Sequence, residues 1–422
     1  MRLAVSENIP FKGSDGMVIL NDQQERASYG ACDWYHAFLR GDNVRAWYEI
    51  SGPAGSGKTT LVKYIIKQLG LTNDQVVFIT FTGKAALALR LSGVPGRTIH
   101  SICYQTTIIN EKDVNGNIVY VNGKPKLKRI QKKVDKIDPR IKLMVADESG
   151  MIELQMGYDI LSFGVPVIAL GDLHQLPPVF GSGLFLRRPD SILTKVMRQV
   201  EGNPIIYLSQ LAIYHQTIPY GSYGLNGEAQ VIRKDLFNNS HEIASKWLSW
   251  ADMVICGTNR MRDFLNYYVR NNIQGIHGNY VQPGDRLICR QNHWDILLDG
   301  YDDIALVNGL VGNCTETYKN AESRAYVEID FKPEFSNGPQ FESLPINHSY
   351  LFAPYHIRKE MNVLDTTIIP FEFGNAITCH LAQGSQAKKV LVYVENWTDS
   401  GFFWKWLYTA ITRASMELCL VV

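Results

Sequence analysis

Short apolar runs alternate with helical stretches along the first half of the chain. Four runs predict buried strands that end in polar residues: Arg45–Ser51, Val76–Thr80, Leu143–Ala146 and Val165–Leu170. After the first run, apolar residues recur at helical spacing up to Leu69, and Ala85–Leu91 predicts a second helix. This alternation predicts a parallel α/β sheet. Because ligands of such sheets lie beyond the carboxyl ends of the strands, the polar residues that follow them are candidate site residues.

The second half of the chain shows the same pattern, with insertions. Turn dipeptides flank Ile118–Val121, which predicts a small β-hairpin insertion at about 103–140. Residues from about 284 to 372 are rich in short strands and turns and predict an inserted β module. The α/β pattern continues in predicted strands Met253–Cys256, Lys389–Val394 and Leu418–Val422 and in a predicted helix over Trp406–Ala414. We therefore expect two α/β lobes, 1–200 and 201–422, with one insertion each.

Composition and charge limit the classes of function. The chain has 422 residues and a net charge of +1, so a nucleic-acid site must be a local patch. Lys124–Lys142 carries nine basic residues against two acidic ones, which fits a phosphate-binding surface or a solvated charged face. The seven cysteines include no C-x-x-C, which argues against a zinc site and indicates a reducing cytoplasm. No segment resembles a signal peptide or a membrane helix, so no membrane partner is expected.

Residues Gly52–Thr59 (GPAGSGKT) match the phosphate-binding loop G-x-x-x-x-G-K-[ST]. The loop lies between a predicted strand and a predicted helix, where backbone N–H groups and the helix dipole bind phosphate. Lys58 is expected to contact the outer phosphates of ATP, and the Thr59 hydroxyl is expected to hold Mg²⁺. The expected nucleotide contacts are Gly52, Pro53, Ala54, Gly55, Ser56, Gly57, Lys58, Thr59 and Thr60.

Two further strand ends extend this candidate site. Asp147 is expected to be a Mg²⁺ ligand, and Glu148 is expected to be the general base that polarises the attacking water. On its own, such a pair would more often be a surface acidic pair. Gln175, within the string GDLHQLPPV that begins at residue 171, is placed to sense the γ-phosphate. From its residues alone, that string predicts only a rigid polar turn, because Pro177–Pro178 stiffens it.

The string GDLHQLPPV resembles motif III of superfamily 1B helicases, the group of the RecD subunit and the phage Dda helicase. Other segments resemble motifs of this group in the same order: 20–24 (the Q motif), 82–86 and 98–101 (motif Ia and the TIHS element), 198–199 (motif IV), 376–385 (motif V) and 407–414 (motif VI). One departure is visible after the acidic pair, where Ser149-Gly150 replaces a serine that is often followed by methionine. The resemblance spans nearly the whole chain.

The resemblance implies two RecA-like lobes that sandwich ATP, with a β-hairpin insertion in the first lobe and an SH3-like β insertion in the second. It implies adenine recognition by Gln24, a nucleotide contact at Gly384, a triphosphate contact by Arg198 and an arginine finger at Arg413. The implied catalytic residues are Lys58, Asp147, Glu148, Gln175, Arg198 and Arg413. The implied metal ligands are Thr59 and Asp147.

Single-stranded DNA is the implied track of this enzyme. The implied contacts are Thr82, Lys84, Thr98, His100, Tyr120, Thr378 and His380. Each of the two histidines would, alone, more often be a packing residue, and an aromatic in a small hairpin more often packs on its own face. For Trp404 and Trp406 we expect core packing rather than base stacking.

The implied activity is ATP-dependent 5′ to 3′ translocation and duplex unwinding by a monomeric motor. Such a motor would serve replication, recombination or repair, with single-strand-binding or replication proteins as candidate partners, in the cytoplasm (of the host, if phage-encoded). Two alternatives stay open: an ATPase stimulated by single-stranded DNA that remodels nucleoprotein complexes without unwinding, and an RNA helicase of the same superfamily. A non-catalytic DNA-binding module is disfavoured by the intact Lys58, Asp147, Glu148 and Arg413.

Overall fold

The computed structural model divides the chain into two compact units. It describes residues 20–113, 115–121, 124–125, 127–178, 181–196, 203–301, 304–318, 326–361, 368–395 and 400–422. The first unit groups Met1–Tyr104, Lys133–His215 and Trp404–Thr412. The second unit groups Gln105–Lys132, Gln216–Phe403 and Arg413–Val422.

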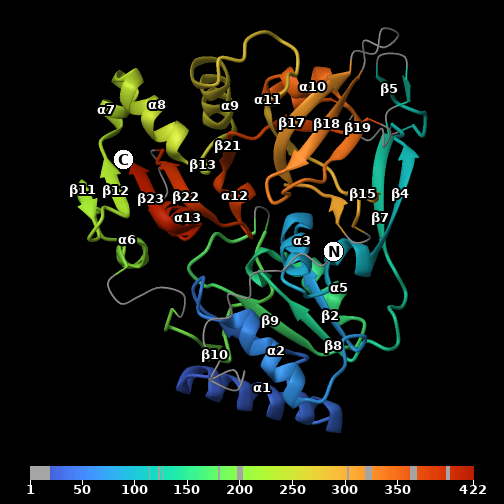
Figure 1. Ribbon diagram of the computed structural model, residues 1–422. Helices are drawn as coiled ribbons and strands as arrows, with labels where there is room; N and C mark the ends of the chain where they lie inside the picture. Colours follow the sequence, from blue (N-terminus) through green and yellow to red (C-terminus); the bar gives the residue numbers. More distant parts are fainter. Residues whose placement is uncertain are drawn as a thin grey trace. The chain divides into compact units, whose positions relative to one another are not determined.

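The first unit is built on a parallel sheet (Figure 1). Its strands are, in spatial order, β10 (Ser191–Ile192), β1 (Trp47–Ser51), β9 (Val167–Gly171), β8 (Leu143–Ala146), β2 (Val76–Thr80) and β3 (Gly96–Thr98). Every pairing in this order is parallel, with Trp47 opposite Val167 and Val76 opposite Leu143. Strands β2 and β8 have the predicted bounds, and β1 and β9 each begin two residues later than predicted.

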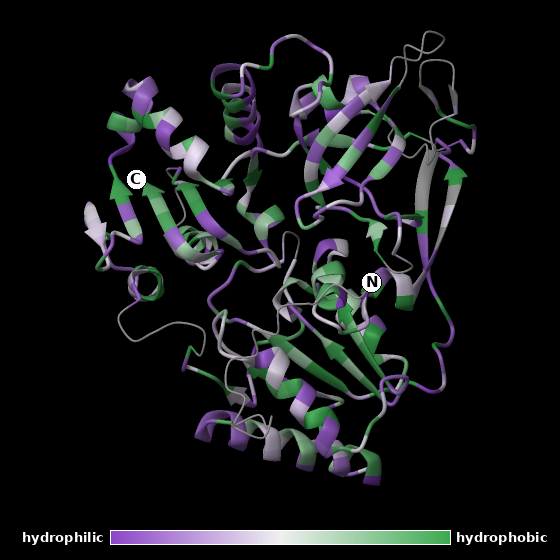
Figure 2. Cartoon of the chain, in the orientation of Figure 1, coloured by the Kyte–Doolittle hydropathy of each residue, from purple (hydrophilic) through white to green (hydrophobic). Residues whose placement is uncertain are grey.

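Apolar side chains cover both faces of this sheet. The helices of the unit are α1 (Asp22–Arg40), α2 (Lys58–Gln68), α3 (Gly83–Leu91), α4 (Ile99–Cys103), a 3₁₀ turn (Ser149–Met151), α5 (Leu154–Leu161) and α6 (Pro204–Ile213). On one face, Ile50 and Phe78 pack with Trp34 of α1 and Leu61 of α2, while Ile79 packs on the opposite face. Figure 2 shows the strands as apolar and α1 and α2 as mixed in hydropathy. Burial on both faces explains the continuous apolar runs in the sequence.

Between α4 and β8 the chain forms two pairs of strands. The outer pair joins β4 (Tyr104–Asn110) to β7 (Leu127–Lys133), and the inner pair joins β5 (Tyr120–Val121) to β6 (Lys124–Pro125). Ile118 forms an isolated bridge with Lys112. The outer pair was not predicted, because its second strand, LKRIQKK, is dominated by basic residues that conceal the strand pattern. Part of the basic run Lys124–Lys142 therefore lies on a strand.

The second unit contains a sheet of the same kind. Its strands are, in spatial order, β11 (Gly221–Tyr223), β12 (Ala229–Ile232), β23 (Ala414–Val421), β22 (Ala387–Tyr393), β13 (Met253–Cys256) and β21 (Ala376–Thr378). Only the pairing of β11 with β12 is antiparallel. The helices are α7 (Lys234–Asn239), α8 (His241–Trp250), α9 (Asn259–Tyr268) with a π-helical turn (Val269–Ile273), α12 (Cys379–Ala382) and α13 (Ser400–Ile411). Most of α13 is grouped with the first unit. None of the helices in the described ranges is both long and apolar enough to cross a bilayer.

The end of the chain differs from the prediction. The helix predicted over Trp406–Ala414 is wrong at both ends, because α13 spans Ser400–Ile411. Ala414 begins strand β23 and lies opposite Ala387 of β22, and the Ala387 N–H donates to the Arg413 carbonyl at 3.0 Å. Pairing with a buried neighbouring strand therefore outweighs the helical spacing of these residues.

The inserted β module is an antiparallel sheet. Its strands are, in spatial order, β19 (Phe341–Ile346), β18 (Val327–Pro333), β17 (Val311–Tyr318), β14 (Arg286–Cys289) and β20 (Phe371–Phe373). A two-stranded ribbon, β15 (His293–Leu297) with β16 (Ala305–Leu306), and two short helices, α10 (His348–Phe352) and α11 (Tyr355–Arg358), complete it. The two helices were not predicted, because each is too short to show a helical period.

A buried ion pair joins the π-helical turn to the start of this module. Arg270 donates from Nε and Nη2 to the two carboxylate oxygens of Asp285, at 2.6 and 3.1 Å. Arg270 also donates to the carbonyls of Gly278 and Tyr280. Both charged side chains are about 1% exposed or less. The bidentate geometry and the additional hydrogen bonds compensate the burial of the two charges.

Candidate active site

The phosphate loop connects β1 to α2 at the carboxyl edge of the first sheet. Gly55 and Gly57 have φ values of 80° and 82°, a conformation that favours glycine. A Cβ atom on Gly52 would approach the Leu193 carbonyl oxygen to 2.8 Å, so this position also requires glycine. The loop sequence thus folds into the turn that its pattern predicts.

The Lys58 ammonium group lies against its own loop. Its Nζ donates to the carbonyl oxygens of Gly52 at 2.6 Å and Pro53 at 3.0 Å. An ammonium group is a rotatable donor, so these bonds can be exchanged for bonds to phosphate oxygens. In the same loop, the buried Ser56 hydroxyl has no hydrogen-bond partner within the described part of the chain. The loop therefore offers one cation and one unsatisfied hydroxyl to a ligand.

The acidic pair follows β8, two strands away from the loop in the sheet order. Glu148 has a φ of 50°, and its N–H donates to Asp147 Oδ1 at 3.0 Å. A left-handed conformation is uncommon outside glycine and often marks functional sites. Burial raises the pKa of Asp147, the Glu148 carboxylate raises it further, and the Lys58 ammonium opposes both. The Asp147 carboxylate therefore lacks full charge compensation from the protein.

These residues fit a Mg²⁺ ion. Mg²⁺ prefers oxygen ligands and usually keeps several waters, binding through one or two protein groups together with phosphate oxygens. Asp147 supplies an undercompensated carboxylate, and Thr59, at the start of α2, supplies a hydroxyl. Among the described residues, no three or more acidic, histidine or cysteine side chains are grouped so that they could hold a metal ion by themselves. The protein therefore offers the few ligands that an ion carried with a nucleotide needs.

The segment after β9 is hydrogen-bonded to α13. The Tyr408 hydroxyl donates to Asp172 Oδ2 at 2.6 Å, and the Leu176 N–H donates to Thr409 Oγ1 at 2.9 Å. Gln175 lies between these two anchors and is largely buried, and its N–H donates to the Asp172 carbonyl. Both bonds join residues more than 230 positions apart, and both lie within the first unit. No local pattern predicts these two bonds, although both partners lie in segments that resemble helicase motifs.

Gln24 is positioned by the start of α1. Its Oε1 accepts the Asn21 N–H at 3.1 Å while Asn21 Oδ1 accepts the N–H groups of Gln23 and Gln24, which forms a capping box. The Gln24 Nε2 donates to the Ser56 carbonyl in the phosphate loop at 3.1 Å. Gln24 therefore lies against the phosphate loop, with its amide already hydrogen-bonded.

The remaining nucleotide candidates belong to the second unit or lie outside the described residues. Arg413 is 2% exposed, and its Nη1 donates to the Ser385 carbonyl at 3.2 Å. Gly384, which directly precedes Ser385, has a φ of 72°. Arg413 and Gly384 are thus brought together by the structure. Arg198 lies outside the residues that the structure describes.

In the first unit, the DNA candidates follow the carboxyl ends of β2 and β3. Thr82 caps α3 by accepting the Ala85 N–H at 3.2 Å, and Thr98 caps α4 by accepting the Ser101 N–H at 3.2 Å. Lys84 lies in the first turn of α3. The His100 ring packs edge-on to Phe81 and lies 5.5 Å from the Tyr104 ring. The two threonines therefore also act as helix caps. His100 packs against neighbouring rings, which fits its alternative role as a packing residue.

In the second unit, Thr378 ends β21 and His380 follows it in α12. Thr378 is largely buried, and the His380 ring stacks on Phe402 at 6.2 Å. Burial lowers the pKa of His380, so its neutral form is favoured. Tyr120 is 61% exposed on β5. The expected core packing of Trp406 is confirmed by its complete burial.

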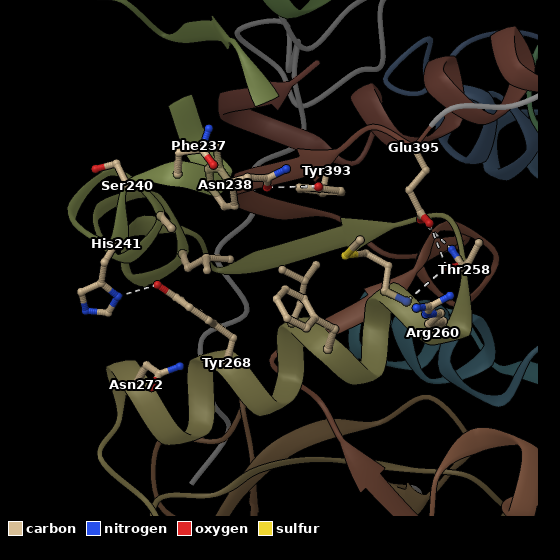
Figure 3. A pocket seen from close by; sticks show the side chains of 16 residues that line it. Phe237, Asn238, Ser240, His241, Thr258, Arg260, Tyr268, Asn272, Tyr393 and Glu395 are labelled. Carbon is tan, nitrogen blue, oxygen red and sulfur yellow. Dashed lines mark hydrogen bonds between the residues drawn. The ribbon is translucent and has the colours of Figure 1, made fainter. Parts of the chain in front are cut away.

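A cavity that the sequence did not predict lies at the carboxyl ends of β13 and β22 (Figure 3). Its volume is about 850 Å³, and α7, α8, α9 and the end of β22 line it. Glu395 accepts the N–H groups of Gly257 and Thr258 at 2.6 and 2.8 Å, and the Thr258 hydroxyl at 2.8 Å. On the other side, His241 Nδ1 and the Tyr268 hydroxyl are 2.6 Å apart. The available signal was Thr258, a helix cap two residues after the end of an apolar strand.

Two protein families match parts of the chain. The AAA domain matches residues 37–216, and the UvrD-like helicase C-terminal domain matches residues 373–421. The first match contains the phosphate loop and the acidic pair, and the second contains motif V, α13 and Arg413.

The ATP-dependent DNA helicase dda of Enterobacteria phage T4 is 32% identical over 135 residues, which make up 31% of this chain and 28% of that protein. An uncharacterized protein of Methanocaldococcus jannaschii is 24% identical over 447 residues, covering 88% of this chain and 36% of that protein. The chain thus spans about a third of the length of these curated relatives.

The Pif1 helicase from Bacteroides, solved with ADP-AlF3 and single-stranded DNA, superposes with a TM-score of 0.53 at 18% identity, over 96% of this chain and 93% of that chain. This similarity shows the fold. The chain is thus similar to the AAA domain in its first half and to a helicase domain in its second half, to part of Dda in sequence and to Pif1 in fold. The predicted α/β class with two RecA-like parallel-sheet lobes and the predicted relation to the Dda-like group are therefore confirmed. The roles of individual residues stay predictions.

Proposed function

We propose that this chain is an ATP-dependent DNA helicase of superfamily 1B that moves 5′ to 3′ along single-stranded DNA and unwinds duplex DNA. One arrangement carries the proposal: the phosphate loop, the acidic pair and Gln175 follow strands of one parallel sheet. The segment around Gln175 is bonded through Asp172 and Leu176 to α13, which leads to Arg413. The DNA substrate is supported by the relation to Dda and to Pif1, and the direction is supported by the resemblance alone.

In the proposed reaction the first unit binds ATP and activates water. Lys58 exchanges its loop carbonyls for the outer phosphate oxygens and compensates their charge. Glu148 accepts the proton of the attacking water, which Gln175 orients. Mg²⁺, held by Thr59 and Asp147, would neutralise phosphate charge when bound.

Arg413 supplies the arginine finger of this reaction. A guanidinium is charged at all relevant pH values and offers planar paired donors to phosphate oxygens. Because Lys58 and Arg413 belong to different compact units, turnover would require both units. We assign Arg198 a second triphosphate contact and Gln24 and Gly384 further nucleotide contacts, on the resemblance of their segments to motifs.

We assign residues 1–200 to lobe 1A and residues 201–422 to lobe 2A. The hairpin at about 103–140 would be insertion 1B, and the β module at about 284–372 would be the SH3-like insertion 2B. The parallel sheet in each unit and the antiparallel sheet formed by β14, β17, β18, β19 and β20 support this division.

The proposed DNA track follows strand ends in both lobes. Thr82, Lys84, Thr98 and His100 would contact the strand in lobe 1A, and Thr378 and His380 would contact it in lobe 2A. Channels for single-stranded nucleic acid combine backbone contacts with base stacking. Tyr120, exposed on its hairpin, is the candidate for stacking at the duplex junction.

We further propose a monomeric motor in a reducing cytoplasm, with single-strand-binding or replication proteins as candidate partners. All seven cysteines are free thiols, and six of them are buried. Free thiols without disulfides suit a reducing compartment. Light scattering in the presence of single-stranded DNA tests the oligomeric state, and a dimer at working concentrations would contradict the monomeric motor.

The experiment for the proposed function is the ATPase rate with single-stranded DNA, with single-stranded RNA and with no polymer. We expect strong stimulation by DNA and weak stimulation by RNA. Equal or stronger stimulation by RNA would favour an RNA helicase. Stimulation by DNA without strand separation on tailed duplexes would favour a remodelling ATPase. No stimulation by either polymer would contradict a nucleic-acid motor.

A further inference from the structure

The side chain of Asn266 on α9 pairs with the edge strand of the second sheet. Its Nδ2 donates to the Ala376 carbonyl and its Oδ1 accepts the Ala376 N–H, both at 2.9 Å. Nδ2 also donates to the Arg262 carbonyl one turn earlier, at 2.9 Å. Asn266 is 3% exposed. The two bonds to Ala376 form a closed amide–amide ring, so one side chain replaces part of a neighbouring strand.

Strand β21 is largely buried, and the Ile377 carbonyl accepts from Cys256 Sγ at 3.6 Å. It consists of Ala376–Thr378 and lies at the edge of the sheet, where β13 is the one strand that pairs with it among the described residues. A short edge strand has few ladder hydrogen bonds, and a slip of one residue would turn each of its side chains to the opposite face. Besides Asn266, Gln274 holds the residue before the strand, donating from Nε2 to Asn375 Oδ1 at 3.2 Å.

The helix that carries Asn266 is itself anchored at several points. Glu395 binds the N–H groups at its start, and Arg262 Nη1 lies 2.8 Å from Glu372 Oε2 of the β module. At its end, Arg270 in the π-helical turn forms the buried pair with Asp285. Groups held by packing and by further hydrogen bonds position their neighbours more tightly than mobile ones. The amide of Asn266 is therefore a fixed reference for β21.

We propose that Asn266 is a positioning residue that holds Thr378 and His380 in place for contact with single-stranded DNA. Thr378 is two residues after Ala376, and His380 follows it in α12. Asn266 acts through the Ala376 backbone. This inference rests on the proposed function, because it assigns a support to the proposed DNA track. It predicts that disturbing Asn266 weakens DNA engagement while leaving the nucleotide site of the first unit intact.

The test is the substitution Asn266→Asp, measured by ATPase kinetics. Aspartate has nearly the same shape and can still accept the Ala376 N–H, but its second oxygen would face the Ala376 carbonyl. We expect the KM for single-stranded DNA to rise about tenfold, the loss expected from one disrupted buried hydrogen bond. The kcat at saturating DNA and the KM for ATP should each change by less than about twofold. The matched control is Asn272→Asp, an exposed asparagine in the following π-helical turn, which should leave the KM for DNA unchanged.

Several outcomes would overturn the inference. Equal DNA KM values for the two variants would show that the ring has no positioning role. A lower kcat, a higher KM for ATP and a lower melting temperature together would show a general structural role instead.

If Asn266→Asp does not fold, hydrogen exchange of the wild-type chain decides. The Ala376 amide should be protected, and exchange at the rate of an open strand edge would contradict the ring. If single-stranded DNA has no effect on the wild-type ATPase, the proposed function fails, whereas protection of the Ala376 amide would still establish the ring itself.

Discussion

The two parallel sheets of this chain support their candidate site residues in different ways. At the first sheet, much of the support is local, because glycines shape the phosphate loop and Thr82 and Thr98 cap the helices that follow their own strands. The bonds from α13 to Asp172 and Leu176 are the distant exception there. At the second sheet, support comes from distant segments: Asn266 holds Ala376, and Glu395 holds the start of α9. Local support leaves a recognisable motif, whereas distant support depends on single buried side chains. The second sheet should therefore be the easier one to disturb at positions far from the chemistry.

The largest effect is expected at the first sheet, from Lys58→Ala. Removing the ammonium leaves the outer phosphates without their main cationic partner, so ATP hydrolysis should fall to background, a loss of about 10³ or more. Steady-state ATPase assays check this. Lys67→Ala, an exposed position on the same helix, should keep the wild-type rate. Surviving hydrolysis in Lys58→Ala would show that the loop is not the catalytic phosphate site.

The next effect concerns the second sheet. Arg413→Ala should lower kcat by about 10³, as for arginine fingers of other phosphate-loop enzymes, because the developing phosphate charge loses its planar donor. Nucleotide binding should persist, as measured with a fluorescent ATP analogue. Weak binding combined with normal turnover would contradict the finger role and would make Arg413 a packing residue held by Ser385.

A change in stability sharpens the comparison. Arg270→Ala leaves the Asp285 carboxylate buried and unpaired, so the free energy of unfolding should fall by about 3–5 kcal/mol. Urea denaturation followed by tryptophan fluorescence measures the loss. The matched control is Arg233→Ala, which removes an exposed ion pair with Asp235 and should leave the midpoint unchanged. Similar midpoints for the two variants would refute the view that buried side-chain links hold the second unit.

The smallest effect concerns the link between Asp172 and α13. Tyr408→Phe removes the hydroxyl that donates to Asp172 and leaves a buried carboxylate oxygen short of one bond. We expect kcat to fall about fivefold to tenfold, with a smaller change in the KM for ATP. Tyr214→Phe, at a position 71% exposed, is the control. An unchanged kcat would mean that this hydrogen bond does not position Gln175.

Much of the fold was predictable because both sheets bury apolar strands on both faces. Such strands appear as continuous apolar runs, and those at Val76, Leu143 and Met253 have the bounds that the sequence predicts. Helix α1 was not predicted, although its capping box at Asn21 and Gln24 is a local signal. The end of α13 was misplaced because the pairing of Ala414 with Ala387 depends on a strand distant in sequence.

The same distinction applies to the candidate site. The phosphate loop and the acidic pair were predictable, because each follows its own strand and has a fixed spacing. The pairing of Asn266 with Ala376 was not, because 110 positions separate the two residues and asparagine is common on helix surfaces. The links of Tyr408 and Thr409 to the segment around Gln175 were hidden for the same reason. Motifs thus mark the candidate reacting groups, and the structure adds the residues that hold them.

The most direct test of the central claim is strand displacement on duplexes with either a 5′ or a 3′ single-stranded tail. Each substrate is compared with ATP, without ATP, and with the Lys58→Ala variant. The account predicts ATP-dependent unwinding of the 5′-tailed duplex, little unwinding of the 3′-tailed one, and none by the variant. Unwinding only from the 3′ tail, or no strand separation despite DNA-stimulated hydrolysis, would contradict a 5′ to 3′ helicase.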